Sequence, residues 1–470
     1  MRKFYWYFTA FFKKHGFTVI ISLVLASVVF WFLIPPLVNY LAVSERHYIG
    51  IVGDYSFANL PESIANQLSI GLTVSAPDGS VLPALAERWK NEQDGALYRF
   101  VLKQNIIWQD GTLVSPADIH YNLKDVEVIV TPNDIVFKLP APFAPFPSTV
   151  TAPLFKEGIL KGRFFTTRPT LIGIGPYKIT DYTKSGNRLK ELIVEGNEQR
   201  FVYRFFQTED DAIVAFKRGE VDTVVNLSRN HDIYSWKTIN VTRTLNQQQY
   251  LALFFNTRTP LFTKNVRQAL SYALEKKKGE ERAIGPISPL SWGYLPGGKT
   301  YDQDWVRGSE RMLSEVPGEP LKFEITTTTL FANKAEEIKK TWEEFGQKVF
   351  TDCKTSASVS DKSKCENVKI AVTIRINNFP DTSNFQTLLV GQTVPSDPDQ
   401  YALWHSGQST NFTGYKNTRI DNLLEKGRQT YNEKERTEIY QEFQQFFLED
   451  PPAIFLEYLW NNTITRKNIF

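Results

Sequence analysis

Residues 82–123 read LPALAERWKNEQDGALYRFVLKQNIIWQDGTLVSPADIHYNL, and this stretch decides the fold. In its first part Leu82, Leu85 and Trp89 stand at helical spacing. That spacing predicts one or two helical turns over residues 83–90. None of these side chains is typical of a catalytic group, so the sequence favours a scaffold here.

The second part of the stretch has the pattern of a strand and a capped helix. Apolar and polar residues alternate over residues 98–103, which predicts a strand with one buried face. Asp-Gly pairs at 94–95 and 110–111 predict turns on either side of it. Ser115 is a good N-cap and Pro116 suits the first helical position, so a helix is expected to follow.

Three motifs in this stretch resemble those of the solute-binding proteins of peptide-type ABC importers, the family of the oligopeptide, dipeptide and nickel binders. The family shows P-x-L-A-E-x-W, D-G-x-x-Y-x-F-x-L and F-x-D-G-x-x-x-x-A-x-D in that order. The corresponding segments here are residues 83–89, 94–102 and 108–118. The resemblance implies an α/β, two-lobed, periplasmic-binding-protein-like fold of type II, in the peptide-binding cluster.

The chain departs from the family pattern after Leu123. Larger members carry a long, mostly helical insertion at this point, whereas here two strands, residues 126–130 and 135–139, follow almost at once. A reduced third subdomain is therefore expected. Cavity contacts that other members make from the insertion are expected to be missing.

The rest of the chain suggests two lobes. The resemblance implies lobe I at residues 45–245, completed by residues 450–470, and lobe II at residues 246–449, with a hinge at 245–251. A β-α-β pattern over residues 321–376 supports a second α/β lobe.

The N-terminus has the pattern of a membrane anchor. Residues 1–16 hold four positive charges and no acid, and residues 17–38 hold no charge. About 20 apolar residues cross a bilayer. We expect an uncleaved signal anchor, with residues 1–16 in the cytoplasm and the domain outside, either periplasmic or extracellular. A removable signal peptide is the rival interpretation.

Composition excludes several functions. The net charge is +3, so the part beyond residue 16 carries 3 − 4 = −1, which argues against a nucleic-acid partner. Five scattered histidines show no metal-ligand spacing, and no G-x-S-x-G motif is present. Residues 293–300 satisfy G-x4-G-K-T, but Pro- and Gly-rich flanks make a P-loop match accidental. Neither an enzyme nor a cofactor is expected.

The two cysteines, Cys353 and Cys365, lie in one polar stretch. Outside the membrane a disulfide between them is favoured. The alternative is a metal-binding pair, but no histidine stands nearby.

The resemblance places six residues near the ligand cavity. They are Asn59, Leu60, Asn256, Asp399, Tyr401 and Trp404. Many peptide-binding family members hold the ligand's amino group with an acid just before the D-P-D segment, but residues 392–395 contain none. Asp399 is one substitute, while turn and helix capping is the competing role of Asp397 and Asp399.

These patterns predict the extracytoplasmic binding component of an ABC importer. Peptides would bind between two lobes that close about a hinge, and the permease and ATPase would be separate chains. The alternatives are a membrane-anchored binder of another solute, such as a nickel chelate or a sugar, and a non-transporting sensor ectodomain.

Overall fold

The computed structural model describes residues 2–42, 45–161, 166–356, 359 and 361–467. The chain divides into two compact units. Unit 1 comprises Met1–Leu60, Gly158–Thr170 and Pro176–Val224, and unit 2 comprises Pro61–Glu157, Leu171–Gly175 and Val225–Phe470. The predicted lobes divide the chain differently and stay a prediction. Residues 468–470 of the predicted closing segment lie outside the described residues.

Unit 1 begins with helix α1 (Arg2–Ala42). Its window Tyr5–Trp31 is long and apolar enough to cross a membrane, and none of that window is covered by other parts of the protein. A signal sequence has the same length and hydropathy near an N-terminus. The helix therefore supports a membrane-directed segment without distinguishing an anchor from a signal.

The sheet of unit 1 is built on the first strand after that helix. Strand β1 pairs in parallel with β12, which pairs antiparallel with β11, and β11 with β10. Their bounds are Glu45–Val52 for β1, Lys178–Ser185 for β10, Arg188–Gly196 for β11 and Gln199–Phe206 for β12. Helix α4 (Glu209–Lys217) begins at Thr208, whose hydroxyl accepts from the Asp211 amide. Strand β13 (Thr223–Leu227) leads into unit 2.

The first part of unit 2, Pro61–Glu157, is called the small subdomain below. Its sheet is antiparallel throughout and has the order β4-β5-β7-β6. These strands are β4 (Ala86–Glu92), β5 (Leu97–Leu102), β6 (Glu127–Val130) and β7 (Asp134–Lys138). The buried side chains Tyr98, Phe100 and Leu102 confirm the predicted alternation over residues 98–103. The smaller elements are α2 (Glu62–Leu68), β2 (Thr73–Ser75), β3 (Val81–Pro83) and α3 (Phe146–Thr149). The two-stranded sheet of β8 (Lys156–Lys161) and β9 (Thr167–Ile172) belongs mostly to unit 1.

The helix predicted over residues 83–90 is wrong, because this segment forms β3 and β4. Trp89 lies opposite Phe100 in the antiparallel pair β4–β5, and a register shift falls between Ala86 and Arg88. A bulge of this kind adds one residue to a strand and breaks the two-residue alternation. Apolar side chains on a bulged strand therefore acquired a spacing that resembles a helix.

The helix expected after Ser115 is reduced to the single 3-10 turn Pro116–Asp118. The predicted cap is present, since Asp118 Oδ2 accepts from the Ser115 amide at 2.8 Å. Beyond it the chain is held extended by Tyr121, whose hydroxyl donates to the Val150 carbonyl at 2.8 Å. Tertiary anchoring ends the helix after one turn.

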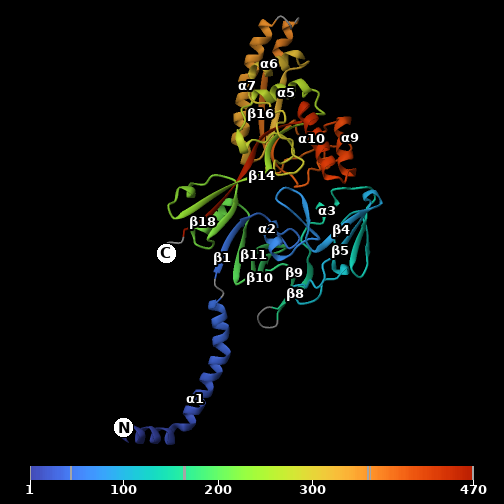
Figure 1. Ribbon diagram of the computed structural model, residues 1–470. Helices are drawn as coiled ribbons and strands as arrows, with labels where there is room; N and C mark the ends of the chain where they lie inside the picture. The colour runs from blue at the N-terminus through green and yellow to red at the C-terminus, as the bar shows by residue number, and fades with distance from the viewer. Residues whose placement is uncertain (1, 43–44, 162–165, 357–358, 360, 468–470) are drawn as a thin grey trace. The chain divides into compact units, whose positions relative to one another are not determined.

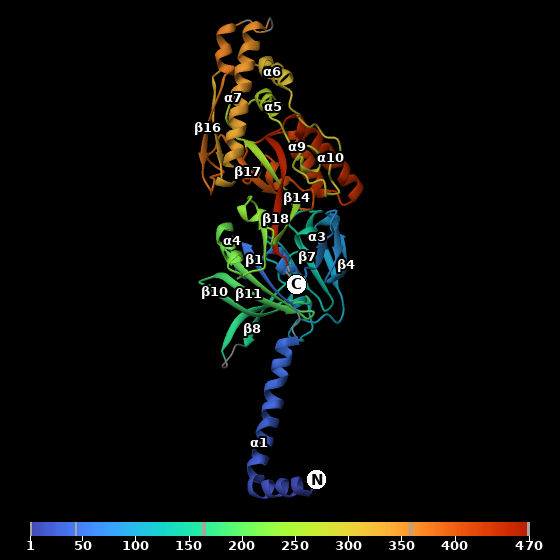
Figure 2. The same ribbon diagram turned by 90° about the vertical axis from the view of Figure 1, so that its left-hand side faces the viewer.

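The large sheet of unit 2 has the order β18-β14-β17-β15-β16. Strand β15 is parallel to both β16 and β17, and helix α7 connects β15 to β16, which confirms the predicted β-α-β pattern. Figures 1 and 2 show α7 beside α5 and α6. The bounds are β14 (Ile239–Phe255), α5 (Lys264–Ala273), α6 (Trp305–Ser314), β15 (Leu321–Thr327), α7 (Ala332–Thr355), β16 (Ile370–Ile376), β17 (Thr387–Thr393) and β18 (Ala453–Arg466).

Three further helices pack against this sheet through a group of buried aromatic side chains. They are α8 (Tyr401–Trp404), α9 (Thr418–Gln429) and α10 (Glu433–Glu449), and Figure 2 shows the last two side by side. Asn417 and Asn432 cap α9 and α10. Phe254 of β14 lies against Trp404, and Phe447 of α10 lies against the same ring. This packing fixes the helices that form one wall of the pocket described next.

Two sequence features have a plain structural outcome. Residues 293–300 form turns, and the described chain begins its next helix only at Trp305, so the segment lacks the helix that a P-loop opens. Cys353 and Cys365 form a disulfide that ties the end of α7 to the turn Lys362–Val368, and both are fully buried.

Candidate functional site

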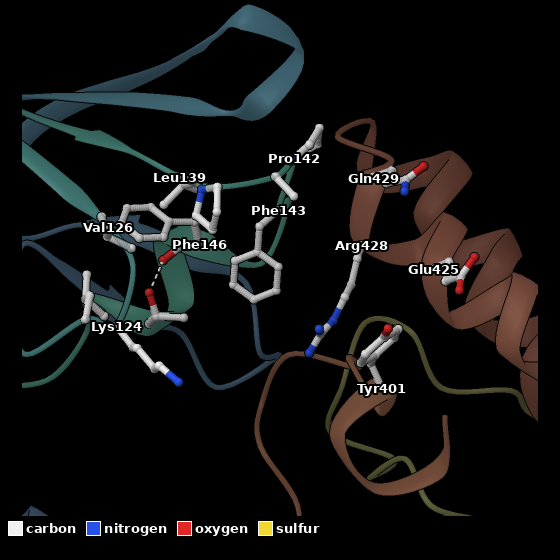
Figure 3. Close-up of a pocket in the computed structure, with 14 residues that line it drawn as sticks. Lys124, Val126, Leu139, Pro142, Phe143, Phe146, Tyr401, Glu425, Arg428 and Gln429 are labelled. Carbon is white, nitrogen blue, oxygen red and sulfur yellow. Dashed lines mark hydrogen bonds between the residues drawn. The ribbon is translucent and has the colours of Figure 1, made fainter. Parts of the chain in front are cut away.

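A cavity of about 510 Å³ lies within unit 2, between the small subdomain and helices α8 and α9 (Figure 3). One wall comes from the small subdomain and is mostly apolar: Leu123, Lys124, Val126, Leu139, Pro140, Ala141, Pro142, Phe143, Phe146 and Thr149. The other wall is formed by Tyr401, Glu425, Arg428 and Gln429. The volume is within the range of small-molecule sites, ~300–1,000 Å³.

Part of the apolar wall is the proline-rich loop after β7, and hydrogen bonds hold this loop in place. Tyr98 donates a hydrogen bond from its hydroxyl to the Phe143 carbonyl at 3.0 Å, and the Phe143 amide donates to the Gly95 carbonyl at 3.3 Å. Phe146 is 2% exposed in the core of the small subdomain. The Ala144 amide then donates to the Arg428 carbonyl at 2.6 Å. A backbone hydrogen bond thus joins the two walls directly.

Arg428 lies at the centre of the opposite wall. Its Nε and Nη2 donate to Asp399 Oδ2 at 2.9 and 2.8 Å. The guanidinium carbon lies 3.9 Å from the Tyr401 ring centroid and 5.1 Å from that of Phe143. A planar guanidinium is suited to such a place because it stacks on rings while its edge forms hydrogen bonds.

A second acid–arginine pair lies close by in sequence but deeper in the protein. Arg436 Nη1 and Nη2 donate to the two oxygens of Asp397 at 2.8 and 2.7 Å. Burial by itself would lower the pKa of Arg436, but the Asp397 carboxylate outweighs it and raises that pKa. Both residues line another cavity, of about 400 Å³, with Trp89, Trp292 and Tyr431 among its walls.

Asp399 and Tyr401, two of the predicted site residues, meet at the first cavity. Tyr401 lines it, and Asp399 positions Arg428 there. Asp399 Oδ1 also accepts from the Tyr401 amide at 3.1 Å, and Asp397 Oδ1 accepts from the Asp399 amide at 2.9 Å. Both aspartates therefore cap the turn, as the competing interpretation held, and in addition each is paired with an arginine.

The other predicted site residues lie elsewhere. Trp404 is fully buried, with its ring centroid 4.7 Å from that of Phe447, so it belongs to the core. Asn256 donates to the Phe385 carbonyl at 2.9 Å and does not line the cavity. Asn59 donates to the Asp54 carbonyl at 3.0 Å and, like Leu60, belongs to unit 1. A ligand contact at Asn59, Leu60 or Asn256 stays a prediction.

Sequence reasoning missed Lys124, Phe143 and Arg428. Arg428 stands in the last turn of α9, where a basic side chain is ordinarily explained by the helix dipole. Phe143 belongs to the segment APFAPFP, whose density of proline and aromatic residues was the available signal of a rigid, ring-bearing loop.

Comparisons with known proteins place the chain among binding proteins. The family model of the middle region of bacterial extracellular solute-binding proteins, family 5, matches residues 123–397. The oligopeptide-binding protein AppA of Bacillus subtilis (strain 168) is 24% identical over 487 aligned residues, which cover 88% of this chain and 85% of the relative.

Solved structures show the same fold. NikZ from Campylobacter jejuni, in complex with Ni(L-His), aligns with a TM-score of 0.67 at 22% identity. The alignment covers 91% of this chain and 94% of the NikZ chain. AppA from Bacillus subtilis, in complex with a nonapeptide, aligns with a TM-score of 0.62 at 18% identity. This alignment covers 90% of this chain and 95% of the AppA chain. They confirm the predicted α/β periplasmic-binding-protein-like fold. Since the family model covers more than half of the chain, the chain belongs to the bacterial extracellular solute-binding proteins of family 5.

Proposed function

We propose that this protein is the extracytoplasmic solute-binding component of an ABC importer and that its solutes are peptides. A general solute-binding role follows from the family. Peptides are the first choice because relatives that cover most of the chain are named oligopeptide- and dipeptide-binding proteins. The family consists of binding proteins and not of enzymes, so the expected event is capture and release without bond chemistry.

The cavity between Phe143 and Tyr401 is the observation that carries this proposal. It has the size of a small-molecule site, mostly apolar walls, and a few polar groups held in place by other side chains. Such a site buries apolar surface for affinity and uses its polar groups for orientation. We assign the solute, or one end of a longer peptide, to this cavity.

In this proposal helix α1 anchors the protein. Residues 17–38 cross the membrane, residues 1–16 stay in the cytoplasm because of their four positive charges, and the binding domain lies outside. The permease and the ATPase are separate chains. Mass spectrometry of the mature protein tests the anchor: a peptide from residues 1–16 in the membrane fraction supports it, and a mature N-terminus beyond residue 38 contradicts it.

A binder of another solute is the second candidate, and one observation favours it. Asp397 and Asp399 are both paired with arginines, so neither carboxylate is available to hold a peptide amine without giving up an ion pair. A nickel chelate is relevant because NikZ, a structural neighbour, was solved with Ni(L-His). The described residues contain no group of three or more metal-ligating side chains, but a chelate brings its own ligands. A sugar as the solute is a weaker candidate that the same experiment tests. A sensor role without transport is another, which adjacent permease and ATPase genes would contradict.

The test is identification of the solute that the protein carries. The full chain is purified in mild detergent, and bound small molecules are released and analysed by mass spectrometry. Peptides in the released fraction, together with a rise in melting temperature when a peptide mixture is added back, support the proposal. Stabilisation by nickel–histidine or a sugar, with none from peptide mixtures, would establish the second candidate instead.

A further inference from the structure

Two cationic side chains enter the cavity from opposite walls. Lys124 comes from the small subdomain and Arg428 from α9, and in Figure 3 both point toward the space beside the Phe143 ring. Arg428 uses Nε and Nη2 for Asp399. Within the described part of the chain, its Nη1 and the Lys124 ammonium have no hydrogen-bond acceptor. Donors therefore face the cavity from both sides.

Among the residues that the structure describes, the carboxylates near the cavity do not accept hydrogen bonds from Arg428 Nη1 or from the Lys124 ammonium. Asp399 is fully engaged, because Oδ2 accepts two hydrogen bonds from Arg428 and Oδ1 accepts one from the Tyr401 amide. Glu425 lines the cavity, but its Oε1 lies 3.0 Å from His405 Nε2. In Figure 3 Glu425 extends from α9 on the side of Arg428 that is away from Phe143. The space between Lys124 and Arg428 thus favours an anionic group.

The surroundings of that space are apolar. Val126, Leu139, Phe143 and Phe146 line the neighbouring wall. A ligand that fits both features carries an anion directly beside an apolar group. Among peptides, the residue that has this form is the last one, when its side chain is apolar.

We propose that the cavity binds the carboxyl-terminal residue of a peptide. The terminal carboxylate accepts hydrogen bonds from Lys124 and from Arg428 Nη1, and the last side chain packs against Phe143. This inference rests on the proposed peptide function and deepens it. It makes the carboxyl end, rather than the amino end, the recognised end, because both aspartates that might hold an amine are already paired with arginines.

One peptide in three chemical forms tests this directly. The full chain in detergent is titrated by calorimetry with a tripeptide ending in phenylalanine, with the same peptide amidated at its carboxyl end, and with the peptide acetylated at its amino end. Amidation should weaken binding about ten- to a hundredfold, since it removes an ionic hydrogen-bond acceptor. Acetylation should change it less than about twofold. Equal binding of the free and amidated forms, or a larger loss on acetylation, overturns the inference.

A variant locates the effect in the cavity. Lys124 is exposed and makes no hydrogen bond that the fold needs, so Lys124→Gln should fold normally. It should weaken the free acid about three- to tenfold and leave the amide unchanged, because an exposed charge pair is worth less than a buried one. Lys103→Gln, an exposed lysine of the same subdomain that does not line the cavity, is the matched control. Equal effects of the two substitutions would contradict the assignment.

A second pair of probes separates this inference from the peptide proposal. 3-Phenylpropanoate and its neutral amide carry the same ring with and without the charge, and their binding is compared by ligand-observed NMR. If no tripeptide binds but the acid binds several-fold more tightly than the amide, the peptide proposal fails and the carboxylate site stands. If acid and amide bind equally, or neither binds, the carboxylate site is refuted even where peptides bind.

Discussion

Asp397 and Asp399 stand two residues apart, and each is paired with an arginine, yet the two pairs have different surroundings. The side chains of Asp397 and Arg436 are 8% and 7% exposed, whereas those of Asp399 and Arg428 are 11% and 28% exposed. Arg436 also donates to the Gly427 carbonyl at 2.8 Å and so connects the helices α9 and α10. Arg428 turns its remaining donor to the cavity beside Phe143. Burial therefore distinguishes the pair to which we assign a structural role from the pair to which we assign binding.

The connection between the two helices explains why the arginines separate. Arg428 lies in the last turn of α9 and Arg436 in the first turn of α10, on either side of a short link. The two helices approach closely, since a Cβ at Gly427 would lie 2.8 Å from the Tyr440 ring. Arg436 points into this contact, and Arg428 points away from it toward the small subdomain.

The largest effect is expected at the buried pair. Asp397→Ala leaves the Arg436 charge buried without its carboxylate, which typically costs about 3–5 kcal/mol of unfolding free energy. Urea denaturation followed by circular dichroism measures it. The double variant Asp397→Leu/Arg436→Met removes both charges and should recover most of the loss. If Asp397→Ala lost less than about 1 kcal/mol of unfolding free energy, the buried pair would not have the structural role that separates it from the pair at the cavity.

The second prediction compares two rings of the same short helix. Trp404→Ala should cost about 3 kcal/mol of unfolding free energy, since it empties a fully buried site. Tyr401→Ala should cost about 1 kcal/mol, because this ring is only partly covered, but it should weaken solute binding since Tyr401 lines the cavity. Denaturation and calorimetry together test the contrast. Weaker binding from a Trp404→Phe variant that remains as stable as the natural protein would place Trp404 in the site after all.

The third prediction concerns the pair at the cavity. Asp399→Asn keeps the shape and part of the hydrogen bonding and removes one charge from a partly exposed pair, so a loss of about 1 kcal/mol is expected. The same urea titration measures it. A loss as large as that of Asp397→Ala would mean that Asp399 also holds the fold together, and the cavity assignment of Arg428 would lose its basis.

The smallest effect is expected at the most exposed pair in this comparison, Lys156 with Asp110. Hydrogen bonds from Lys156 and Thr112 lower the pKa of Asp110 to about 2. The pKa of an aspartate in an unfolded chain is about 3.9. The ionised Asp110 therefore contributes its full share of the unfolding free energy above pH of about 4, and this share is lost as the pH falls toward about 2. Asp110→Asn should cost less than about 1 kcal/mol at neutral pH. Its difference from the natural protein should shrink between pH of about 4 and about 2; a constant difference would contradict this origin.

Local pattern was sufficient for much of the fold and failed where a strand was irregular. The alternation around Phe100 and the cap at Ser115 are contacts among residues a few positions apart, and each appears in the structure. The segment 83–90 was assigned to the wrong element because its bulge at Ala86 and Arg88 exists only in the pairing with β5. Pairing partners are not encoded in the spacing of one strand.

The sequence by itself determined the family, the α/β class and the apolar N-terminal helix, because motifs, alternation and hydropathy are properties of neighbouring residues. Only the tertiary structure decided which residues form the candidate site. Arg428 meets Asp399 across 29 positions and Arg436 meets Asp397 across 39, and the Phe143 loop reaches the end of α9 through the hydrogen bond from the Ala144 amide to the Arg428 carbonyl. Such contacts depend on how helices and loops pack, which no local periodicity records.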